Sequence, residues 1–149
     1  MTTVPDFALV ADDGNAFGSR DLEGGRYLLV WTVDASSTAC TALLVGFASQ
    51  HEAFADLTCR VVCVSGAPTE ENRAARVRYQ LPFPIVSDPG GRLAAELGLD
   101  LRALRPSGHA AVLVSATGEV VRRYLEFDPG YLADDVLDDL ESMDAERTE

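Results

Sequence analysis

The residue best placed for chemistry is Cys40, which stands where a buried strand is expected to give way to a helix. The run from Tyr27 to Trp31 is short, uncharged and rich in aromatic and branched side chains, which is typical of a strand buried on both faces. Ser37 and its polar neighbours can cap a helix, and apolar residues recur with helical spacing from Leu43 to Leu57. The first turn of a helix offers unpaired N–H groups and a positive dipole end, which favour a thiolate. The placement predicts an activated nucleophile, and a small buried residue on the inner helix face is the alternative.

The other two cysteines, Cys59 and Cys63, fall on the next expected strand. Positions four apart on a strand share a face but lie roughly 13 Å apart, so these two cannot bridge each other. Cys63 is nearer the end where Cys40 is expected, so it can either react with an oxidised Cys40 after local unfolding or simply pack in the core. His51 lies about 16 Å along the helix from Cys40 and is not its partner. No Cys and His group has metal-site spacing, so neither a metal nor a cofactor is expected.

The net negative charge of the chain argues against two classes of binding partner, nucleic acid and anionic lipid. The chain has 149 residues with a formal net charge of −12, and all 12 basic residues are arginine. A field of this sign repels nucleic acid and anionic lipid, so we expect binding to neither. The absence of lysine fits both a GC-rich genome and adaptation to a salty cytoplasm. No apolar stretch is long enough to span a membrane, and no secretory signal is visible. With an odd number of cysteines, the sequence favours a cytoplasmic protein.

The remaining patterns predict one domain over residues 1–149 of the α/β class. A short hairpin is expected within residues 4–17, with Ser19 capping a single helical turn. Strands are then expected at 60–65, 85–86, 110–114 and 120–125, and helices after Gly66, after Asp88 and from Leu132 onward. The charged tail after Met143 is expected to fray. This order matches a thioredoxin-like fold, a central mixed sheet flanked by helices with an N-terminal β-hairpin, although pattern alone leaves other α/β folds open.

Several stretches together resemble the peroxiredoxin family, in the branch that contains alkyl hydroperoxide reductase and bacterioferritin comigratory protein. They are Val4-Pro5-Asp6-Phe7, Asp13-Gly14, Asp21-Leu22-Glu23-Gly24, Val61-Val62-Cys63-Val64-Ser65, Leu81-Pro82-Phe83-Pro84-Ile85-Val86-Ser87-Asp88-Pro89-Gly90-Gly91, Leu97-Gly98-Leu99 and Gly118. The likeness covers the chain from about Val4 to Met143. It implies that Cys40 is the peroxidatic cysteine, which attacks a hydroperoxide to give a sulfenic acid that a thiol then reduces.

The family's active-site signature is only partly present around Cys40. Ser37 matches the Thr or Ser that hydrogen-bonds the thiolate or the peroxide, whereas Val33 stands where the signature has proline. Members of this branch often carry glutamate three residues after the cysteine, and here that position is Leu43. Phe47, seven residues after the cysteine, agrees with the family. The resemblance therefore keeps the nucleophile and one hydroxyl but loses two supporting residues.

The most consequential departure is His109, which falls where the family has an arginine that holds the thiolate and the peroxide. Arginine is a permanent cation, whereas a histidine with an ordinary pKa of about 6.5 is mostly neutral at pH 7. A neutral imidazole still donates one hydrogen bond or relays a proton to the leaving oxygen. If the imidazolium is required, reactivity should fall as pH rises from about 6 to 8.

The resemblance also implies partners and a mode of recycling. The family's common resolving cysteine would fall on Val45, so a one-cysteine mechanism follows, with an external reductant that is either a thioredoxin-like protein or a low-molecular-weight thiol. A homodimer is what the family implies.

Two other functions were weighed against a thiol peroxidase. A disulfide reductase needs Cys-x-x-Cys, but Ser37 occupies the first of these positions, and Ala110 replaces the cis-proline expected near the late strand. A peroxiredoxin-fold protein that has lost catalysis and acts as a binding or dimer-forming module is favoured by Val33, Leu43 and His109. Retention of Ser37 and Cys40 opposes it.

Overall fold

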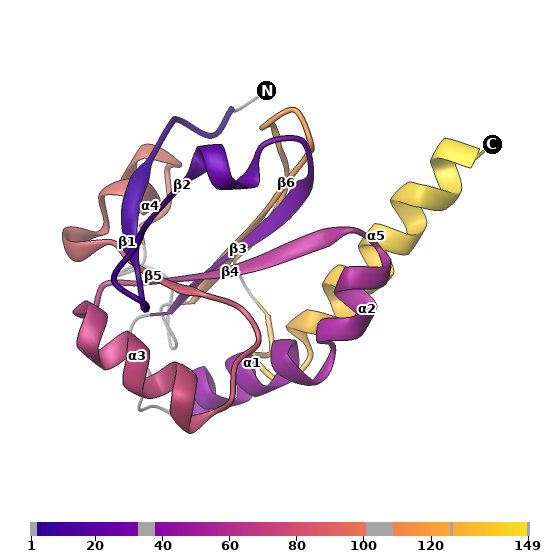
Figure 1. The fold of residues 1–149 in the computed structure, drawn as a ribbon. Coiled ribbons are helices and arrows are strands. Elements are labelled where there is room, and N and C mark those ends of the chain that lie inside the picture. Colours follow the sequence, from indigo (N-terminus) through magenta and orange to yellow (C-terminus); the bar gives the residue numbers. More distant parts are fainter. Residues whose placement is uncertain (1–2, 33–37, 101–108, 126, 149) are drawn as a thin grey trace.

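A seven-stranded mixed sheet with helices on both faces forms the body of the protein in the computed structural model, which describes residues 3–32, 38–100, 109–125 and 127–148 (Figure 1). The strands within these residues are β1 (Ala8–Ala11), β2 (Ala16–Gly18), β3 (Arg26–Thr32), β4 (Cys59–Ser65), β5 (Ile85–Ser87), β6 (Ala110–Val114) and β7 (Val120–Tyr124). The helices are α1 (Thr38–Ser49), α2 (His51–Asp56), α3 (Thr69–Arg78), α4 (Arg92–Glu96) and α5 (Leu132–Thr148), with short 3-10 turns η1 (Ser19–Leu22) and η2 (Pro89–Gly91).

The strand order is β2-β1-β5-β4-β3-β6-β7, which places β3 and β4 at the centre. β3, β4 and β5 are parallel, while the N-terminal hairpin and the β6–β7 pair are antiparallel to their neighbours. β3 is buried after Arg26 and β4 after Arg60, which agrees with the uncharged branched residues that follow these two arginines. Their carboxyl ends meet at one edge of the sheet, at Thr32, Ser65 and Ser87.

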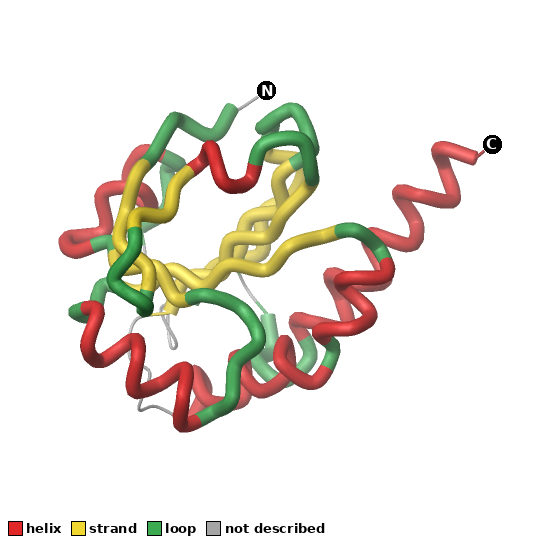
Figure 2. Tube along the Cα trace, viewed as in Figure 1, coloured by secondary structure: helices red, strands yellow, loops and turns green. Residues whose placement is uncertain are grey.

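Each face of the sheet carries its own hydrophobic cluster. Side chains of α1, α2, α3 and α5 pack against one face together with Val30 and Cys63, and those of η1 and α4 pack against the other face with Trp31. Figure 2 shows the first group of helices along one side of the strands and α4 on the opposite side. Alternate residues of β3 and β4 therefore face different layers.

Three features differ from the sequence prediction, and contacts between residues far apart in the chain occur at each of them. The predicted helix from Cys40 to Leu57 is divided into α1 and α2 at Gln50, whose amide donates to Asp134 on α5. Ser19 does not cap η1, because its hydroxyl accepts a hydrogen bond from the backbone N–H of Phe7. The predicted fraying after Met143 is wrong, since α5 continues to Thr148.

The C-terminal half of α5 is held by a two-pronged contact with the sheet. Arg26 donates to both carboxylate oxygens of Asp144 at 2.8 Å and also to the carbonyl of Leu57 at the end of α2. A bidentate arginine–carboxylate pair of this kind is stronger and more directional than a single ion pair. It fixes the ends of α2 and α5 to the start of β3. These two helices, together with α1 and α3, form the helical layer that covers this face of the sheet.

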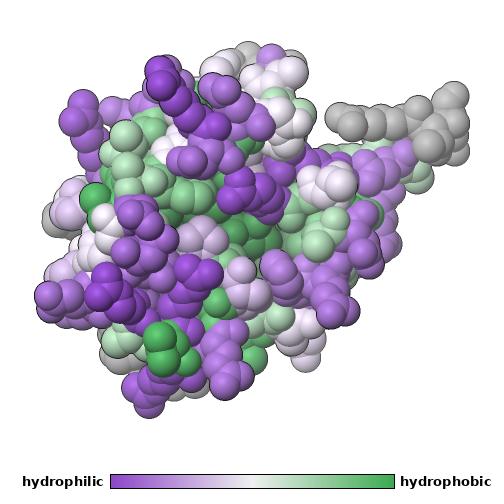
Figure 3. Space-filling model, in the orientation of Figure 1, coloured by the Kyte–Doolittle hydropathy of each residue, from purple (hydrophilic) through white to green (hydrophobic). Residues whose placement is uncertain are grey.

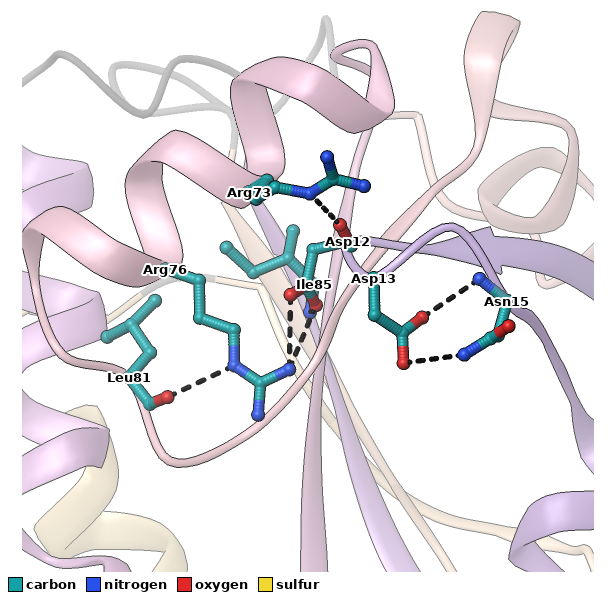
Figure 4. A network of polar contacts seen from close by, with 7 residues as sticks. All are labelled: Asp12, Asp13, Asn15, Arg73, Arg76, Leu81 and Ile85. Atoms are coloured by element: carbon teal, nitrogen blue, oxygen red, sulfur yellow. Dashed lines mark hydrogen bonds and ion pairs between the residues drawn. The ribbon is translucent and has the colours of Figure 1, made fainter.

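A second polar contact network ties the N-terminal hairpin to α3 and β5 (Figure 4). The carboxylate of Asp12 is buried, accepts from Arg76 at 3.1 and 3.2 Å, and accepts from the backbone N–H of Ile85 at 2.9 Å. Arg73 donates to the carbonyl of Asp12, and Arg76 also donates to the carbonyl of Leu81. One carboxylate thus fixes three separate elements beside the parallel strands.

Hydrophilic side chains cover much of the face drawn in Figure 3, in line with the formal net charge of −12. On the face drawn in Figure 3, apolar side chains form patches among hydrophilic ones. Asp134, Asp135 and Asp138 of α5 are exposed, as expected for residues off the apolar stripe. Within the described residues, every helix is too short or too polar to cross a bilayer.

Candidate active site

Cys40 is the third residue of α1 and lies over the face of the sheet that the helical layer covers. α1 follows β3 in the chain, so its first turn stands at the carboxyl ends of the parallel strands. The side chain of Cys40 has no exposed surface and packs in the same hydrophobic cluster as Val30 and Cys63. Cys40 therefore lies at the predicted start of a helix, but its side chain is buried rather than open to solvent.

Cys63 lies beneath the helical layer, near the carboxyl end of β4. Its Sγ is 3.8 Å from the hydroxyl oxygen of Thr32, the last residue of β3. Burial raises the pKa of Cys63 to about 12, the Thr32 hydrogen bond lowers it, and the nearby charge of Cys40 raises it. Cys63 is thus a neutral thiol close to Cys40. The thiolate is the reactive form of cysteine, so a neutral Cys63 is a poor nucleophile toward peroxide.

His109 directly precedes β6 and is almost completely buried. Ala110 pairs with Trp31 on the far face of the sheet, whereas Ala111 faces the helical layer. Alternation then places residue 109 on the same face as Cys40. Burial lowers the pKa of His109, so the imidazole is neutral at pH 7 and does not supply the positive charge of an arginine. A role as hydrogen-bond donor or proton relay is still open to it, and its catalytic role stays a prediction.

The lowered pKa of His109 predicts how stability depends on pH. Below about pH 6.5 the unfolded chain binds a proton that the folded imidazole resists, so the free energy of unfolding should fall as pH decreases from about 7 to 5. Chemical denaturation of the wild type and of His109→Asn at pH 7 and pH 5 measures this change in the free energy of unfolding. The substitution should make the change between the two pH values smaller. His51→Asn, at an exposed site on α2, is the matched control and should leave the difference intact. If the free energy of unfolding changed equally with pH in the wild type and in His109→Asn, the loss of stability at low pH would not come from His109.

The other residues singled out in the sequence have clear positions or lie outside the described chain. Ser37 and Val33 are outside the described residues, so the hydroxyl predicted beside the thiolate stays a prediction. Leu43 belongs to α1, and its side chain is completely buried in the core. An apolar side chain therefore stands where the family often has glutamate. Val45, at the family's resolving position, is 46% exposed. Cys59 lies at the opposite end of β4, and burial raises its pKa to about 12.

The sequence pattern did not indicate the contact between Thr32 and Cys63. The only signal was a polar residue ending an otherwise apolar strand, at the edge where parallel strands present functional groups. The three cysteines, all within the described residues, form no disulfide. In the same part of the chain, no three Cys, His, Asp or Glu side chains group as metal ligands do.

Comparison with known proteins identifies the family. The family model described as AhpC/TSA matches residues 1–123, which is most of the chain and includes β1 to β7 up to Arg123. The chain belongs to the AhpC/TSA family of peroxiredoxins. In this AhpC/TSA protein Cys40 lies in the first turn of α1, and its role as the peroxidatic cysteine stays a prediction.

Curated relatives of this AhpC/TSA protein include peroxiredoxin Q from the chloroplast of Sedum lineare, which is 27% identical over 145 residues. That match covers 95% of this chain and 77% of the relative. Peroxiredoxin bcp1 of Schizosaccharomyces pombe is 23% identical and is matched over 85% of this chain and 66% of its own length.

Solved structures agree on the fold. The peroxidoxin BcpB of Mycobacterium tuberculosis superposes with a TM-score of 0.86 at 24% identity, covering 95% of each chain. AhpC of Enterococcus faecalis superposes with a TM-score of 0.83 at 22% identity, covering 99% of this chain and 95% of the other. The predicted thioredoxin-like α/β fold is thereby confirmed.

Proposed function

We propose that this protein is a thiol peroxidase in which Cys40 reduces a hydroperoxide and is returned to the thiol by an external thiol reductant. The observation that carries the proposal is the position of Cys40 in the first turn of α1, at the carboxyl edge of the parallel strands, in a chain of the AhpC/TSA family. The Cys40 thiolate attacks the terminal oxygen of the peroxide and breaks the O–O bond. Cys40 becomes a sulfenic acid, and the departing alkoxide or hydroxide takes a proton to leave as an alcohol or water.

Two features of the proposed site act on the charges that form during peroxide reduction, namely the start of α1 and His109. The N–H groups at the start of α1 and the helix dipole stabilise negative charge on the attacking sulfur. His109, held neutral by burial, is proposed to donate the proton to the leaving oxygen in place of the charge that the family arginine supplies. Loss of one preorganised donor of this kind costs about 10²–10³ in rate. We therefore propose a slow peroxidase whose rate lacks the fall between pH 6 and 8 that an essential imidazolium would impose.

The substrate class follows from the burial of Cys40. A sulfur without exposed surface favours small molecules, so we propose hydrogen peroxide and short alkyl hydroperoxides as substrates. A homodimer and a cytoplasmic location stay predictions.

Peroxide consumption by the purified protein with dithiothreitol tests the function. Consumption should be proportional to protein concentration, should require the reductant, and should be faster with hydrogen peroxide than with cumene hydroperoxide. A rate equal to that of dithiothreitol alone would contradict the proposal and would favour the alternative predicted from Val33, Leu43 and His109, a family member that binds partners without catalysis. That alternative draws its structural support from the complete burial of Cys40.

A further inference from the structure

Two sulfur atoms lie under the helical layer at the carboxyl edge of the sheet, one on a helix and one on a strand. The side chains of Cys40 and Cys63 are 0% and 1% exposed and belong to one hydrophobic cluster. Cys40 is close enough for its charge to act on the Cys63 thiol, and Thr32 contacts the same thiol at 3.8 Å. We propose that Cys63 is the disulfide partner of Cys40, so that oxidation of Cys40 ends in a Cys40–Cys63 bond. The proposal rests on the proposed function.

The strand geometry selects Cys63 over Cys59. Both thiols project from β4, but Cys59 pairs with Arg26 at the start of β3, whereas Cys63 pairs with Val30 near its end. Four residues of strand separate the two by roughly 13 Å. Cys40 enters the sheet layer from the carboxyl end of β3, so it can approach Cys63 and cannot reach Cys59.

The chemistry balances without creating charge in the core. Once the peroxide has converted Cys40 to a sulfenic acid, the sulfur of Cys63 attacks the sulfur of Cys40. The S–S bond forms, the S–O bond breaks, and the hydroxyl leaves with the Cys63 proton as water. Thr32 is the hydroxyl in contact with Cys63 and can pass on that proton. The external thiol named above, oxidised to its own disulfide, reduces the bond and restores both cysteines.

Closing the bond requires the first turn of α1 and the end of β4 to approach each other. A disulfide needs Cα atoms about 4.4–6.8 Å apart, which is closer than a helix resting on a sheet usually allows. Cys40 is the third residue of α1, so the part of the helix that must approach β4 is its first turn. Because burial raises the pKa of Cys63 to about 12, its thiol is neutral before Cys40 is oxidised and is a poor nucleophile toward peroxide.

The arrangement of arginines in the sequence allows a direct test. Trypsin places Cys40 and Cys59 in the peptide 27–60 and Cys63 in the peptide 61–73. The experiment therefore uses the Cys59→Ala variant, in which a link between these two peptides can come only from Cys40 and Cys63. The reduced variant is treated with one equivalent of hydrogen peroxide in the presence of dimedone, a sulfenic acid trap, and mapped by mass spectrometry. A variant with both Cys59→Ala and Cys63→Ala is treated in parallel.

The expected result is a linked pair of peptides in Cys59→Ala and a dimedone adduct on Cys40 in the double variant. Equal dimedone labelling of Cys40 in both variants, with no linked peptide, would overturn the disulfide while leaving the peroxidase intact. If neither variant consumes peroxide, the peroxidase proposal fails. The pairing is then tested separately by treating folded Cys59→Ala with diamide, which oxidises pairs of thiols directly. A linked peptide after diamide supports the pairing of Cys40 and Cys63, and its absence overturns it.

Discussion

Replacing Cys40 with serine is expected to reduce the protein-dependent consumption of peroxide by more than about 10³-fold, to the level of the reductant alone. The substitution changes one atom in a completely buried side chain, so the fold should persist while the nucleophile is lost. The measurement is the rate of hydrogen peroxide loss with dithiothreitol, with circular dichroism to confirm that the variant is folded.

Cys59→Ser is the matched control for this loss of activity. It also replaces a buried thiol, but at the opposite end of β4 from the proposed site. It should keep the wild-type rate per folded molecule. If Cys59→Ser and Cys40→Ser lost activity equally while remaining folded, the proposed identity of the nucleophile would be wrong.

Replacing Asp12 with alanine is expected to have the largest effect on stability, a loss of about 2–4 kcal/mol in the free energy of unfolding. The change removes the acceptor for the buried N–H of Ile85 and the partner of Arg76 at the same time. The side chain of Arg76 is 34% exposed, so water compensates part of the lost ion pair, and the estimate lies below that for a fully buried pair. Urea denaturation followed by circular dichroism measures the effect.

Two further variants separate the parts of this network. Asp12→Asn retains a carbonyl oxygen for the N–H of Ile85 but removes the charge opposite Arg76, so its loss should be smaller than that of Asp12→Ala. Asp13→Ala is the control, because the exposed carboxylate of Asp13 accepts hydrogen bonds from Asn15 within the same turn. A loss for Asp13→Ala as large as that for Asp12→Ala would show that the turn, rather than the buried network, carries the effect.

The sequence predicted the strands most accurately because their burial leaves a clear signal. The uncharged run at 110–114 coincides with β6, and the run from Tyr27 to Trp31 lies within β3. Both are covered on two faces, so neither shows the alternation that would blur their limits. β7 is an edge strand with exposed side chains, and it ends at Tyr124, one residue before the predicted limit.

The features that sequence could not predict depend on partners far along the chain. The division of the predicted long helix at Gln50 involves Asp134, and the continuation of α5 beyond Met143 involves Arg26 and Asp144. None of these residues is a helix breaker or former strong enough to signal the outcome locally. Contacts between residues far apart in the chain therefore accompany both helix limits that differ from the prediction.

At the site, the sequence located Cys40 because a strand-to-helix junction has a recognisable composition. The contact of Cys63 with Thr32 could not be predicted, since it depends on the register between β3 and β4, whose paired residues are more than thirty positions apart. The neutral state of His109 likewise follows from burial under side chains that are remote in sequence.

The most direct test of the central claim is to identify which cysteine of the folded wild type is reversibly oxidised by peroxide. The reduced protein receives a brief pulse of hydrogen peroxide and is denatured in iodoacetamide, then reduced and treated with N-ethylmaleimide, and peptide fragmentation distinguishes Cys40 from Cys59. The account predicts that Cys40 carries N-ethylmaleimide, whether it was a sulfenic acid or a disulfide, while Cys59 carries the iodoacetamide label. Iodoacetamide on Cys40 with the peroxide unconsumed would contradict it.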